Sequence, residues 1–311
     1  MRNAPVSEKA PVGVFVGLAT LDVIHRIAKP PAVNEKITST AQFVAAGGPA
    51  ANAAVTFAAL GGDATLVTAL GDDPVADLIR ADLAEYGVVV VDAAAGTIRA
   101  VPVSAVSVVE STGDRSVVSL DAVNSDASPP GDLGDLLTTA DVVLVDGHHP
   151  LIAGAGVRLA AARATPLVVD AGRWKPVMSD IIPYATDMVC SNDFRIPGAD
   201  DDAESTAAAL VRSGVRTVVT THGGDPVDWW SDGESGSVPV EPVAVVDTLG
   251  AGDAFHGAYA YFSTQIESGV AERIDRSARV AALRCSVVGP RAWLSKLPTE
   301  FHTEQTRKRD R

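Results

Sequence analysis

Residues 246–255 read VDTLGAGDAF and connect a strand-like run that ends at Asp247 to an Ala-rich helix that begins near Gly252. The small residues at 250–252 allow a ligand to approach the backbone closely, and their N–H groups lie at the start of the helix. Unpaired amide donors and the positive end of the helix dipole together form an anion site. The loop is therefore predicted to hold a group whose charge spreads over several oxygens, as in phosphoryl transfer.

Asp253 lies in the first turn of this predicted helix, beside the anion site. A carboxylate there can accept the proton of a hydroxyl group while that hydroxyl attacks a phosphorus atom. A glycine turn followed by a capping aspartate is common in α/β proteins, so a bare GxGD would say little about function. The complete run DTLGAGD between a strand and a helix favours a catalytic base.

Outward from this loop, short Val-rich runs alternate with Ala-rich helical stretches, which predicts a mostly parallel sheet with helices on both faces. The expected strands are Val12–Leu18, Ala64–Leu70, Val88–Val91, Asp141–Val145, Leu167–Asp170, Asp187–Ser191 and Thr217–Thr221. The expected helices are Pro49–Leu60, Pro74–Tyr86, Ala153–Ala164, Lys175–Ile182, Ala203–Ser213, Gly252–Ile266 and Ala271–Val287.

Two segments interrupt this alternation. Residues 23–46 are polar and extended in character, and residues 98–120 predict two consecutive strands, Ile98–Val109 and Ser116–Leu120. We expect them to form a small β lid over the sheet. A hairpin is also expected around a turn at Asp232–Gly236. Residues 12–298 are expected to form one domain, followed by a charged tail at 299–311.

The composition bears on the partners and the location of the protein. The chain has 25 Lys and Arg residues against 39 Asp and Glu residues, a formal net charge of −14. Phosphate backbones and anionic membranes repel such a chain, so neither is an expected partner. Only two cysteines occur, Cys190 and Cys285, far apart in sequence, and they provide neither a disulfide framework nor a metal-binding spacing. The apolar run Val12–Ala19 is too short for a signal peptide or a membrane span, and we expect a cytoplasmic protein.

The segment Asp247–Asp253 resembles the C-terminal signature of the PfkB (ribokinase-like) carbohydrate kinase family. Residues 47–54, GGPAANAA, resemble the Gly-Gly signature near the N-terminus of that family. The order of parts matches from about Val12 to Leu297, and VVDTLGAGDAFHGA and VAALRC are most similar to the ketohexokinase and sulfofructose kinase branches. The resemblance implies a three-layer α/β/α fold with a β lid. It also implies an ATP-dependent kinase that phosphorylates a hydroxyl of a sugar, preferably a ketohexose or a related sugar.

The resemblance assigns catalysis to the loop described above. Asp253 matches the catalytic base of the family. The family's anion hole corresponds to three residues of this chain, Gly250, Ala251 and Gly252. Pro49 stands where ribokinases have lysine and some ketohexokinases have asparagine. Because a proline side chain offers no polar contact, this difference argues against ribose itself as the substrate.

The same resemblance assigns the substrate site. Asp22, Gly48 and Asn52 match sugar-binding positions, and aspartate and asparagine supply the acceptors and donors that pair with adjacent hydroxyls. Arg115 resembles a lid arginine that reaches substrate and phosphate. A solvated turn residue is an equally good interpretation of Arg115.

For the nucleotide, Thr221 and Gly223 match the Thr-x-Gly turn near ATP, and Asn192 begins the stretch that corresponds to the Asn-x-x-Glu motif. In that stretch Arg195 stands where the family's glutamate helps to organise Mg²⁺. The ketohexokinase and sulfofructose kinase branches also lack the full motif. Mg²⁺ is therefore expected to be held mainly by ATP phosphates and water.

A monovalent cation is a second candidate ion. Asp247 and the Leu249 carbonyl match the position where ribokinase-type members hold a monovalent cation, so K⁺ is a candidate cofactor. His148 and His149 follow a predicted strand, where ligands bind in open α/β sheets. Adjacent histidines in an extended chain do not easily chelate one ion, so no metal is assigned to them. Lys175 and its neighbour Arg173 either neutralise an anionic group or belong to a solvated loop.

Two other functions remain open beside the sugar kinase. A nucleoside kinase of the same fold would be favoured by a base-stacking aromatic residue in the lid, where only Phe43 is found. A non-catalytic sugar- or nucleotide-binding protein would keep the fold without turnover. A dinucleotide-dependent dehydrogenase is disfavoured, because Gly13–Asp22 lacks the phosphate-binding glycine fingerprint. Exposed lid edges need cover, and family members often pair their lids, so a homodimer is expected.

Overall fold

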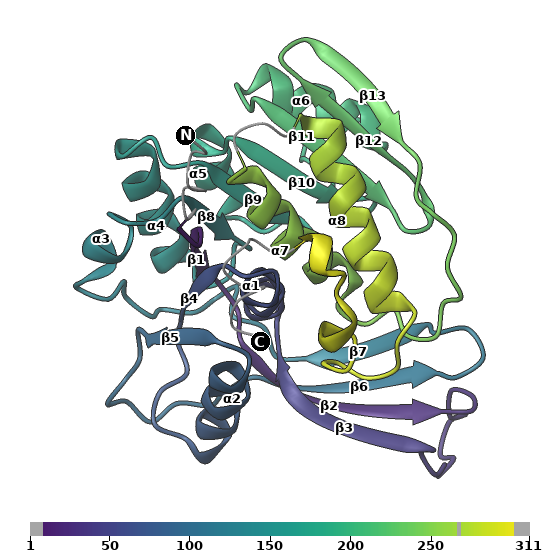
Figure 1. The fold of residues 1–311 in the computed structure, drawn as a ribbon. Coiled ribbons are helices and arrows are strands. Elements are labelled where there is room, and N and C mark those ends of the chain that lie inside the picture. Colours follow the sequence, from purple (N-terminus) through teal and green to yellow (C-terminus); the bar gives the residue numbers. More distant parts are fainter. Residues whose placement is uncertain (1–8, 266–268, 302–311) are drawn as a thin grey trace, which may run out of the picture.

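The computed structural model describes residues 9–265 and 269–301, which form two β-sheets with helices packed around the larger one (Figure 1). In this part of the chain the larger sheet has the strand order β13 (Glu234–Val238), β12 (Asp225–Ser231), β11 (Thr217–His222), β10 (Asp187–Ser191), β9 (Leu167–Ala171), β8 (Val142–Val145), β1 (Val12–Val16), β4 (Asp63–Thr68) and β5 (Val88–Asp92). Pairing is parallel from β11 to β5, and β12 and β13 are antiparallel. The predicted mostly parallel sheet is confirmed.

Both faces of the larger sheet are covered, because its strands are apolar on both sides. Phe15 and Leu144 belong to the core on one face, and Val14 and Val143 belong to the core on the other. The first face packs against α1 (Pro49–Ala59), α2 (Pro74–Glu85), α7 (Ala251–Ser263) and α8 (Val270–Cys285). The second face packs against α3 (Leu133–Leu136), α4 (Pro150–Ala162), α5 (Met178–Ile181) and α6 (Ala203–Arg212). The expected three-layer α/β/α arrangement is therefore confirmed.

The smaller sheet is the lid, with the strand order β3 (Ala41–Gly47), β2 (Thr20–Ile27), β6 (Val103–Val109) and β7 (Arg115–Ser119). In Figure 1 it extends from one end of the larger sheet, below α7 and α8. Ile24, Val106 and Val108 form an apolar cluster on its inner face, against which Phe43 and Leu249 pack. The lid therefore covers the loop before α7. Its first strand begins at Thr20, earlier than the expected residue 23.

Two strand expectations were wrong in detail. The strand expected over Ile98–Val109 begins only at Val103, because Pro102 has no N–H to donate and instead accepts a hydrogen bond from the Leu21 amide over 3.0 Å. The hairpin turn is also tighter than expected. It consists of Asp232 and Gly233, which have φ angles of 51° and 85°, as a two-residue turn between twisted strands requires.

Helix ends differ from expectation mainly at prolines. The helix expected over Lys175–Ile182 is reduced to α5, followed by a 3₁₀ turn that includes Pro183. Other 3₁₀ turns are Leu294–Lys296 and Thr299–Phe301. The expected end of the penultimate helix at Ile266 lies outside the described residues, as do residues 302–311 of the expected tail. Phe301 itself is buried against the ring of Phe262.

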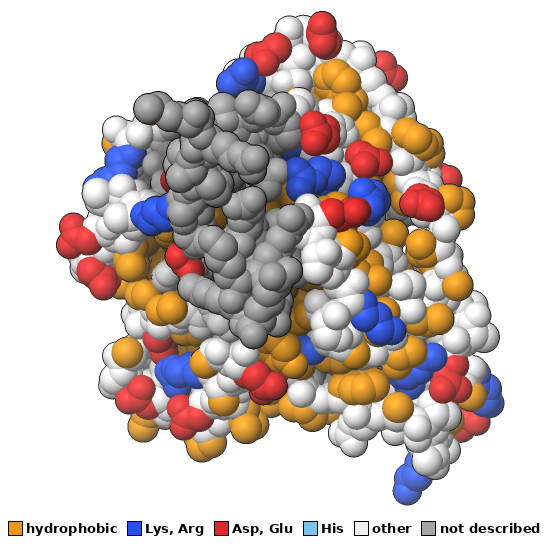
Figure 2. All heavy atoms as spheres, viewed as in Figure 1, with side chains coloured by type: hydrophobic (Ala, Val, Ile, Leu, Met, Phe, Trp, Pro, Cys, Tyr) orange, Lys and Arg blue, Asp and Glu red, His pale blue; other side chains and the backbone are white. Residues whose placement is uncertain are grey.

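Two features are relevant to membrane and nucleic-acid partners: the character of the helices and the distribution of charge on the surface. Within the described ranges, no helix has the length and apolar character that crossing a bilayer demands. Acidic and basic side chains are interspersed on the face drawn in Figure 2, with hydrophobic side chains between them.

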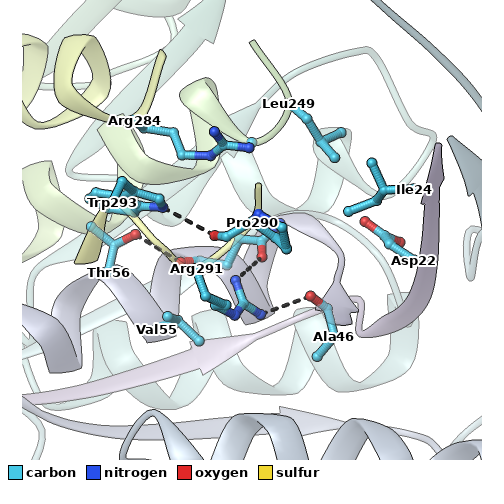
Figure 3. Close-up of a pocket in the computed structure, with 12 residues that line it drawn as sticks. Asp22, Ile24, Ala46, Val55, Thr56, Leu249, Arg284, Pro290, Arg291 and Trp293 are labelled. Atoms are coloured by element: carbon cyan, nitrogen blue, oxygen red, sulfur yellow. Dashed lines mark hydrogen bonds between the residues drawn. The ribbon is translucent and has the colours of Figure 1, made fainter. Parts of the chain in front are cut away.

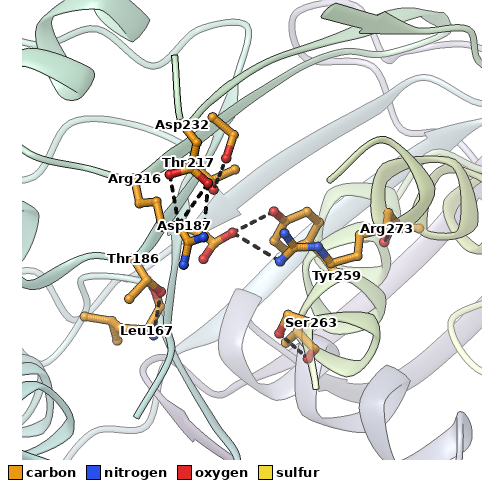
Figure 4. Close-up of polar contacts among 12 residues, drawn as sticks. Leu167, Thr186, Asp187, Arg216, Thr217, Asp232, Tyr259, Ser263 and Arg273 are labelled. Carbon is orange, nitrogen blue, oxygen red and sulfur yellow. Dashed lines mark hydrogen bonds and ion pairs between the residues drawn. The ribbon is translucent and has the colours of Figure 1, made fainter. Parts of the chain in front are cut away.

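A buried polar contact holds α7 against the start of β10 (Figure 4). The Tyr259 hydroxyl donates to Asp187 Oδ1 over 2.7 Å, and Arg273 Nη1 of α8 lies 3.5 Å from the same oxygen. Burial raises the pKa of Tyr259 well above its ordinary value, and the Asp187 charge adds to this effect. The tyrosine therefore stays neutral and donates. One carboxylate thus ties two helices to the sheet at the end opposite the α7 N-terminus.

We expect Tyr259→Phe to lower the free energy of unfolding by about 1–3 kcal/mol, because a buried charged acceptor loses its donor. Chemical denaturation monitored by circular dichroism measures this change. Tyr184→Phe is the matched control, since Tyr184 is 38% exposed and its substitution should change stability by less than about 0.5 kcal/mol. Equal effects of the two substitutions would contradict the role given to this contact.

Candidate active site

Helix α7 begins without a side-chain cap, at the loop that the sequence singled out. Its N-cap Gly250 has left-handed backbone angles (φ 71°, ψ 13°), which glycine adopts readily. The Ala251 amide donates back to the Thr248 carbonyl over 3.3 Å, whereas the Gly252 and Asp253 amides are first-turn donors that the helix itself leaves unpaired. A Cβ atom added to Gly252 would meet no atom within 4 Å. The helix start is thus open to an anion, through Gly252 and Asp253 more than through Ala251.

Asp253 is held in place by Asn52 of α1. Asn52 Nδ2 donates to Asp253 Oδ2 over 2.8 Å, although the two residues are 201 positions apart in sequence. Their helices can approach closely because Gly257 lies against α1. A Cβ atom there would come within 2.3 Å of the Ala53 carbonyl oxygen. The structure therefore brings together the predicted base and one predicted sugar-binding residue.

Arg291 orients the Asn52 amide, and it was not identified from the sequence. Its Nη1 donates to Asn52 Oδ1 over 3.1 Å, and its Nη2 donates to the Ala46 carbonyl over 2.8 Å (Figure 3). The same Nη2 also lies 2.9 Å from Asp82 Oδ2. Because a guanidinium only donates, the Asn52 oxygen must face Arg291 and its NH₂ group must face Asp253. A single arginine in the loop after α8 has no local pattern that would indicate this role.

Asp22 lies in lid strand β2, which follows the first strand of the larger sheet. Thr20 Oγ1 donates to its carboxylate over 2.6 Å, and a Cβ atom on Gly47 would come within 2.1 Å of that carboxylate. Glycine at 47 therefore makes room for Asp22. Burial raises the pKa of Asp22; hydrogen bonds from Thr20 and Ser104 oppose this rise, and the charge of Asp253 adds to it. The acid thus faces the same space as Asp253.

Gly48 begins α1 at a place that admits no side chain. Its φ is 95°, and a Cβ atom would come within 2.4 Å of the Leu18 carbonyl oxygen. Asp146, which the sequence analysis did not single out, accepts hydrogen bonds from the Leu18 and Ala50 amides over 2.9 and 3.2 Å. Burial would raise the pKa of Asp146, but His148 and nearby donors lower it below its ordinary value. The Gly-Gly signature is therefore anchored by a buried, ionised acid.

The polar residues after β8 and β9 are largely buried. Lys175 is 4% exposed and donates to the Asp146 carbonyl over 2.7 Å, so the solvated-loop interpretation fails for this residue, while Arg173 is exposed. His148 and His149 are also buried, and burial lowers the pKa of His149 to about 4. Both histidines therefore belong to the packed base of the site.

A second buried acid–base pair lies one helical turn after Asp253. His256 Nε2 is 3.2 Å from the Val189 carbonyl oxygen and its Nδ1 is 3.3 Å from Asp170 Oδ2. A carbonyl oxygen only accepts, so Nε2 carries a proton. Burial raises the pKa of Asp170. His256 therefore donates through Nε2 and lies beside the buried Asp170 carboxyl group.

A narrow cavity lies between the lid and the start of α7. Asp22, Asn52, Gly250, Arg291 and Trp293 line it (Figure 3), and its volume is about 20 Å³. That volume holds about one water molecule. In this arrangement the cavity is therefore too small for a sugar.

The lid is tied directly to the loop before α7. The Thr248 amide and hydroxyl both donate to the Gly113 carbonyl, over 3.1 and 2.8 Å. Arg26 Nη1 of β2 donates to the Val246 carbonyl over 3.0 Å. Arg115 Nη1 lies 3.3 Å from Thr248 Oγ1, so this lid arginine points toward the anion loop. When the lid moves, these contacts must therefore break, or the loop before α7 must move together with the lid.

The predicted nucleotide residues lie at the carboxyl ends of β10 and β11. His222 bridges them to the adjacent hairpin: its Nδ1 is 2.9 Å from Asn192 Oδ1, and its Nε2 is 3.1 Å from Asp228 Oδ2. Thr221 Oγ1 donates to a strand carbonyl, and Gly223 turns the chain with a φ of 66°. An open pocket of about 470 Å³ lies beside Asn192 and His222.

Arg195 does not replace the family's glutamate in a metal site. It donates to the Asn192 and Phe194 carbonyls over 2.6 and 2.9 Å, and its Nε lies 3.1 Å from Asp201 Oδ1. In the described ranges, no three His, Cys, Asp or Glu side chains are grouped to hold a metal ion.

The Arg284 side chain lies against Asp247, one of the two residues expected to hold a monovalent cation. The Asp247 carboxylate is 3.2 Å from Arg284 Nη2, and it also accepts the Leu249 and Gly289 amides over 3.0 and 3.1 Å. Arg284, like Arg291, was not identified from the sequence.

A parallel sheet under a β lid, with an uncapped helix start beside an oriented carboxylate, is the arrangement of a small-molecule phosphotransferase. The chain belongs to the pfkB family of carbohydrate kinases, whose family model matches residues 14–297. Yeast (Saccharomyces cerevisiae) adenosine kinase is 29% identical over 50% of this chain, and the match spans 52% of that protein. The ATP-dependent ribose-1-phosphate kinase of Halopiger xanaduensis is 27% identical over 83% of this chain and 86% of its own length. A putative ribokinase from Agrobacterium tumefaciens has a similar structure, with a TM-score of 0.81 and 26% identity over 97% of this chain and 98% of that one.

Proposed function

We propose that this protein transfers the γ-phosphoryl group of ATP to a hydroxyl of a sugar, with Asp253 as the base. The observation that carries the proposal is the Asn52–Asp253 hydrogen bond at the open start of α7. A free anion site and a fixed proton acceptor lie within one helical turn, as in-line phosphoryl transfer requires. The ATP dependence named for the Halopiger relative supports the choice of donor.

Each part of the site has one task in this mechanism. Asp253 removes the hydroxyl proton, and the Asn52 NH₂ group keeps the carboxylate aimed at that proton. The Gly252 and Asp253 amides stabilise the charge that develops on the transferred group. Mg²⁺ held by the ATP phosphates would neutralise part of their charge. The lid excludes water when it closes, so that the phosphoryl group is not lost to hydrolysis.

We further propose a ketohexose or a related sugar as the substrate. The phrases VVDTLGAGDAFHGA and VAALRC support this branch, and Pro49 removes the polar contact that ribokinases make at that position. Asp22 and Asn52 face the cavity and can pair with adjacent hydroxyls. The test is ADP release across ketoses, aldoses, sulfosugars and nucleosides at equal concentration. The highest kcat/KM for a non-ketose sugar would contradict the ketose preference, and no turnover with any of them would contradict the kinase.

A nucleoside kinase is the second candidate, and one residue favours it. Trp293 lines the cavity, with its Nε1 bonded to the Pro290 carbonyl over 3.1 Å, and an indole face can stack on a base. Phe43, the aromatic residue expected for this task, instead packs into the lid cluster. Nucleosides in the substrate panel decide between the two candidates.

We expect Asp22→Asn to stabilise the fold at pH 7 while it weakens sugar binding. Because burial raises the pKa of Asp22 above its ordinary value of about 3.9, its ionisation costs stability at neutral pH. The contribution of Asp22 is fully favourable below pH 4 and is lost as the pH rises through the folded-state pKa. The variant should therefore unfold at a higher temperature at pH 7, the difference should vanish near pH 3.5, and KM for the sugar should rise about 10-fold or more.

Asp92→Asn is the control, because its expected change in unfolding temperature at pH 7 has the opposite sign. Burial opposes its ionisation, but the Leu70, Ala94 and Gly71 amides and Arg80 together lower the pKa of Asp92. This variant should unfold at a lower temperature at pH 7 without a change in KM. A lower unfolding temperature for Asp22→Asn would contradict the prediction.

We also propose a homodimer that pairs two lids. The strand register places Val44, Val23, Ala105 and Val118 in one row across the outer face of the lid. Val44 and Val118 are 54% and 76% exposed, and an apolar row across a whole sheet is a liability unless it is covered. Light scattering should give twice the monomer mass, and Val118→Lys should give the monomer. A monomeric wild-type protein at micromolar concentration would exclude this dimer.

We propose that residues 12–298 act as one kinase domain, which agrees with the extent of the family match. The free cysteines Cys190 and Cys285 support a cytoplasmic location.

A further inference from the structure

Arg284 places a buried positive charge directly behind the anion loop. It lies at the end of α8, and 3% of its side chain is exposed. Its Nη2 is 3.2 Å from Asp247 Oδ2, and its Nη1 is 3.1 Å from the Val287 carbonyl oxygen and 3.5 Å from the Asp247 carbonyl oxygen. The guanidinium thus occupies a cage made of one carboxylate and two carbonyl oxygens. In Figure 3 it extends toward Leu249.

This cage determines the shape of the loop before α7. Asp247 Oδ1 accepts the Leu249 amide two residues further on over 3.0 Å, and Asp247 Oδ2 accepts the Gly289 amide over 3.1 Å. The first bond closes an Asx turn, which sets the backbone that enters Gly250. Asp247 is 2% exposed, and a buried carboxylate without a compensating charge is strongly destabilising. The loop therefore needs a cation at this point.

The oxygen set is of the kind that a free hard cation would bind, because carboxylate and carbonyl oxygens suit such ions. The positive charge of Arg284 is already there. A second cation in the same cage would lie within a few ångströms of the guanidinium and would be repelled in a poorly solvated space. The residues therefore do not fit the monovalent cation that the sequence led us to expect.

We propose that Arg284 is a built-in cation that replaces a free monovalent ion in this protein. It acts through Asp247 as a positioning residue for the anion loop, and its side chain also lines the narrow cavity between the lid and α7. The kinase consequently needs no K⁺. Removal of the side chain leaves an oxygen cage with an unmatched negative charge, which a free cation can then fill.

The test compares wild type and Arg284→Ala in choline chloride, KCl and dilute guanidinium chloride at equal ionic strength. Thermal unfolding is the first readout, because it needs no substrate and is independent of the proposed function. ADP release with the best substrate is the second. Wild type should have the same unfolding temperature in choline and K⁺, and rates within about twofold. The variant should lose about 100-fold in kcat in choline, because the anion loop is misplaced, and recover at least part of this loss, with a higher unfolding temperature, in K⁺ or guanidinium.

Arg273→Ala is the matched control, since it removes another arginine of α8 from a buried aspartate, Asp187, away from the loop. It should lower the unfolding temperature equally in choline and K⁺. If Arg284→Ala does not fold, Arg284→Lys takes its place, and K⁺ should leave the unfolding temperature of that variant unchanged.

Three outcomes would overturn the proposal. The first is a wild-type protein that K⁺ activates more than about tenfold over choline. The second is a folded Arg284→Ala whose rate and unfolding temperature do not respond to either cation. The third is an Arg284→Lys variant that K⁺ stabilises.

Discussion

Asp253→Asn is expected to lower kcat by about 10²- to 10⁴-fold, the usual contribution of a general base. An amide at this position keeps the shape of the side chain but cannot accept the hydroxyl proton. It also faces the Asn52 NH₂ group at a distance of 2.8 Å in the native protein, and one oxygen remains to accept that bond. The fold and the affinity for ATP should therefore change little, while chemistry slows.

Single-turnover measurement of ADP formation separates this effect from product release. Asp132→Asn is a suitable control, because Asp132 is exposed and makes no capping hydrogen bond at the start of α3. Thermal unfolding of both variants should match that of wild type. If Asp253→Asn turned over at nearly the normal rate, another group would have to remove the proton, and the assignment of the base would be wrong.

Gly252→Ala is expected to reduce kcat by about 10²-fold or more without weakening the fold. No atom lies within 4 Å of the position that the new Cβ would occupy, so the folded protein accommodates it. Alanine is also the better helix former by about 1 kcal/mol, and stability should rise slightly. The same open space is where the transferred group must contact the Gly252 amide, and loss of one such donor costs about 10²- to 10³-fold.

Higher stability together with lower activity would show that Gly252 lies on a ligand-binding surface. A glycine that is packed against other residues would instead lose stability when it is replaced by alanine. Gly131→Ala is the control, since a Cβ there also meets nothing within 4 Å and lies outside the site. It should leave both kcat and the unfolding temperature nearly unchanged. Normal activity in Gly252→Ala would place the phosphoryl group elsewhere and would remove the anion loop from the mechanism.

Loss of activity without loss of stability is expected at both positions because the site is supported from behind. Arg291 holds Asn52, Asn52 holds Asp253, and Arg284 holds Asp247. Gly252 and Asp253 are therefore expected to contribute more to the reaction than to the stability of the fold.

The local parts of this protein could be predicted from its sequence. The alternation of Val-rich runs and Ala-rich helices indicated the parallel sheet with helices on both faces, because burial on both sides requires continuous apolar strands. The DTLGAGD run indicated a helix start with free amides and an acid in its first turn, since glycine conformation and helix geometry act within a few residues. The lid was also predicted, although its first strand starts at Thr20 and so includes Asp22.

The tertiary structure alone decided which side chains complete the site. Arg291 reaches Asn52 across 239 positions, and Asp146 accepts the Leu18 amide across 128. Arg284 fills the cage of Asp247 where the sequence led us to expect an ion. These partners depend on how α1, α7, α8 and the lid pack against one another. A pattern of neighbouring residues describes the backbone of its own segment, whereas the partner of a buried charge is selected by the folded chain, because only there is the charge removed from water.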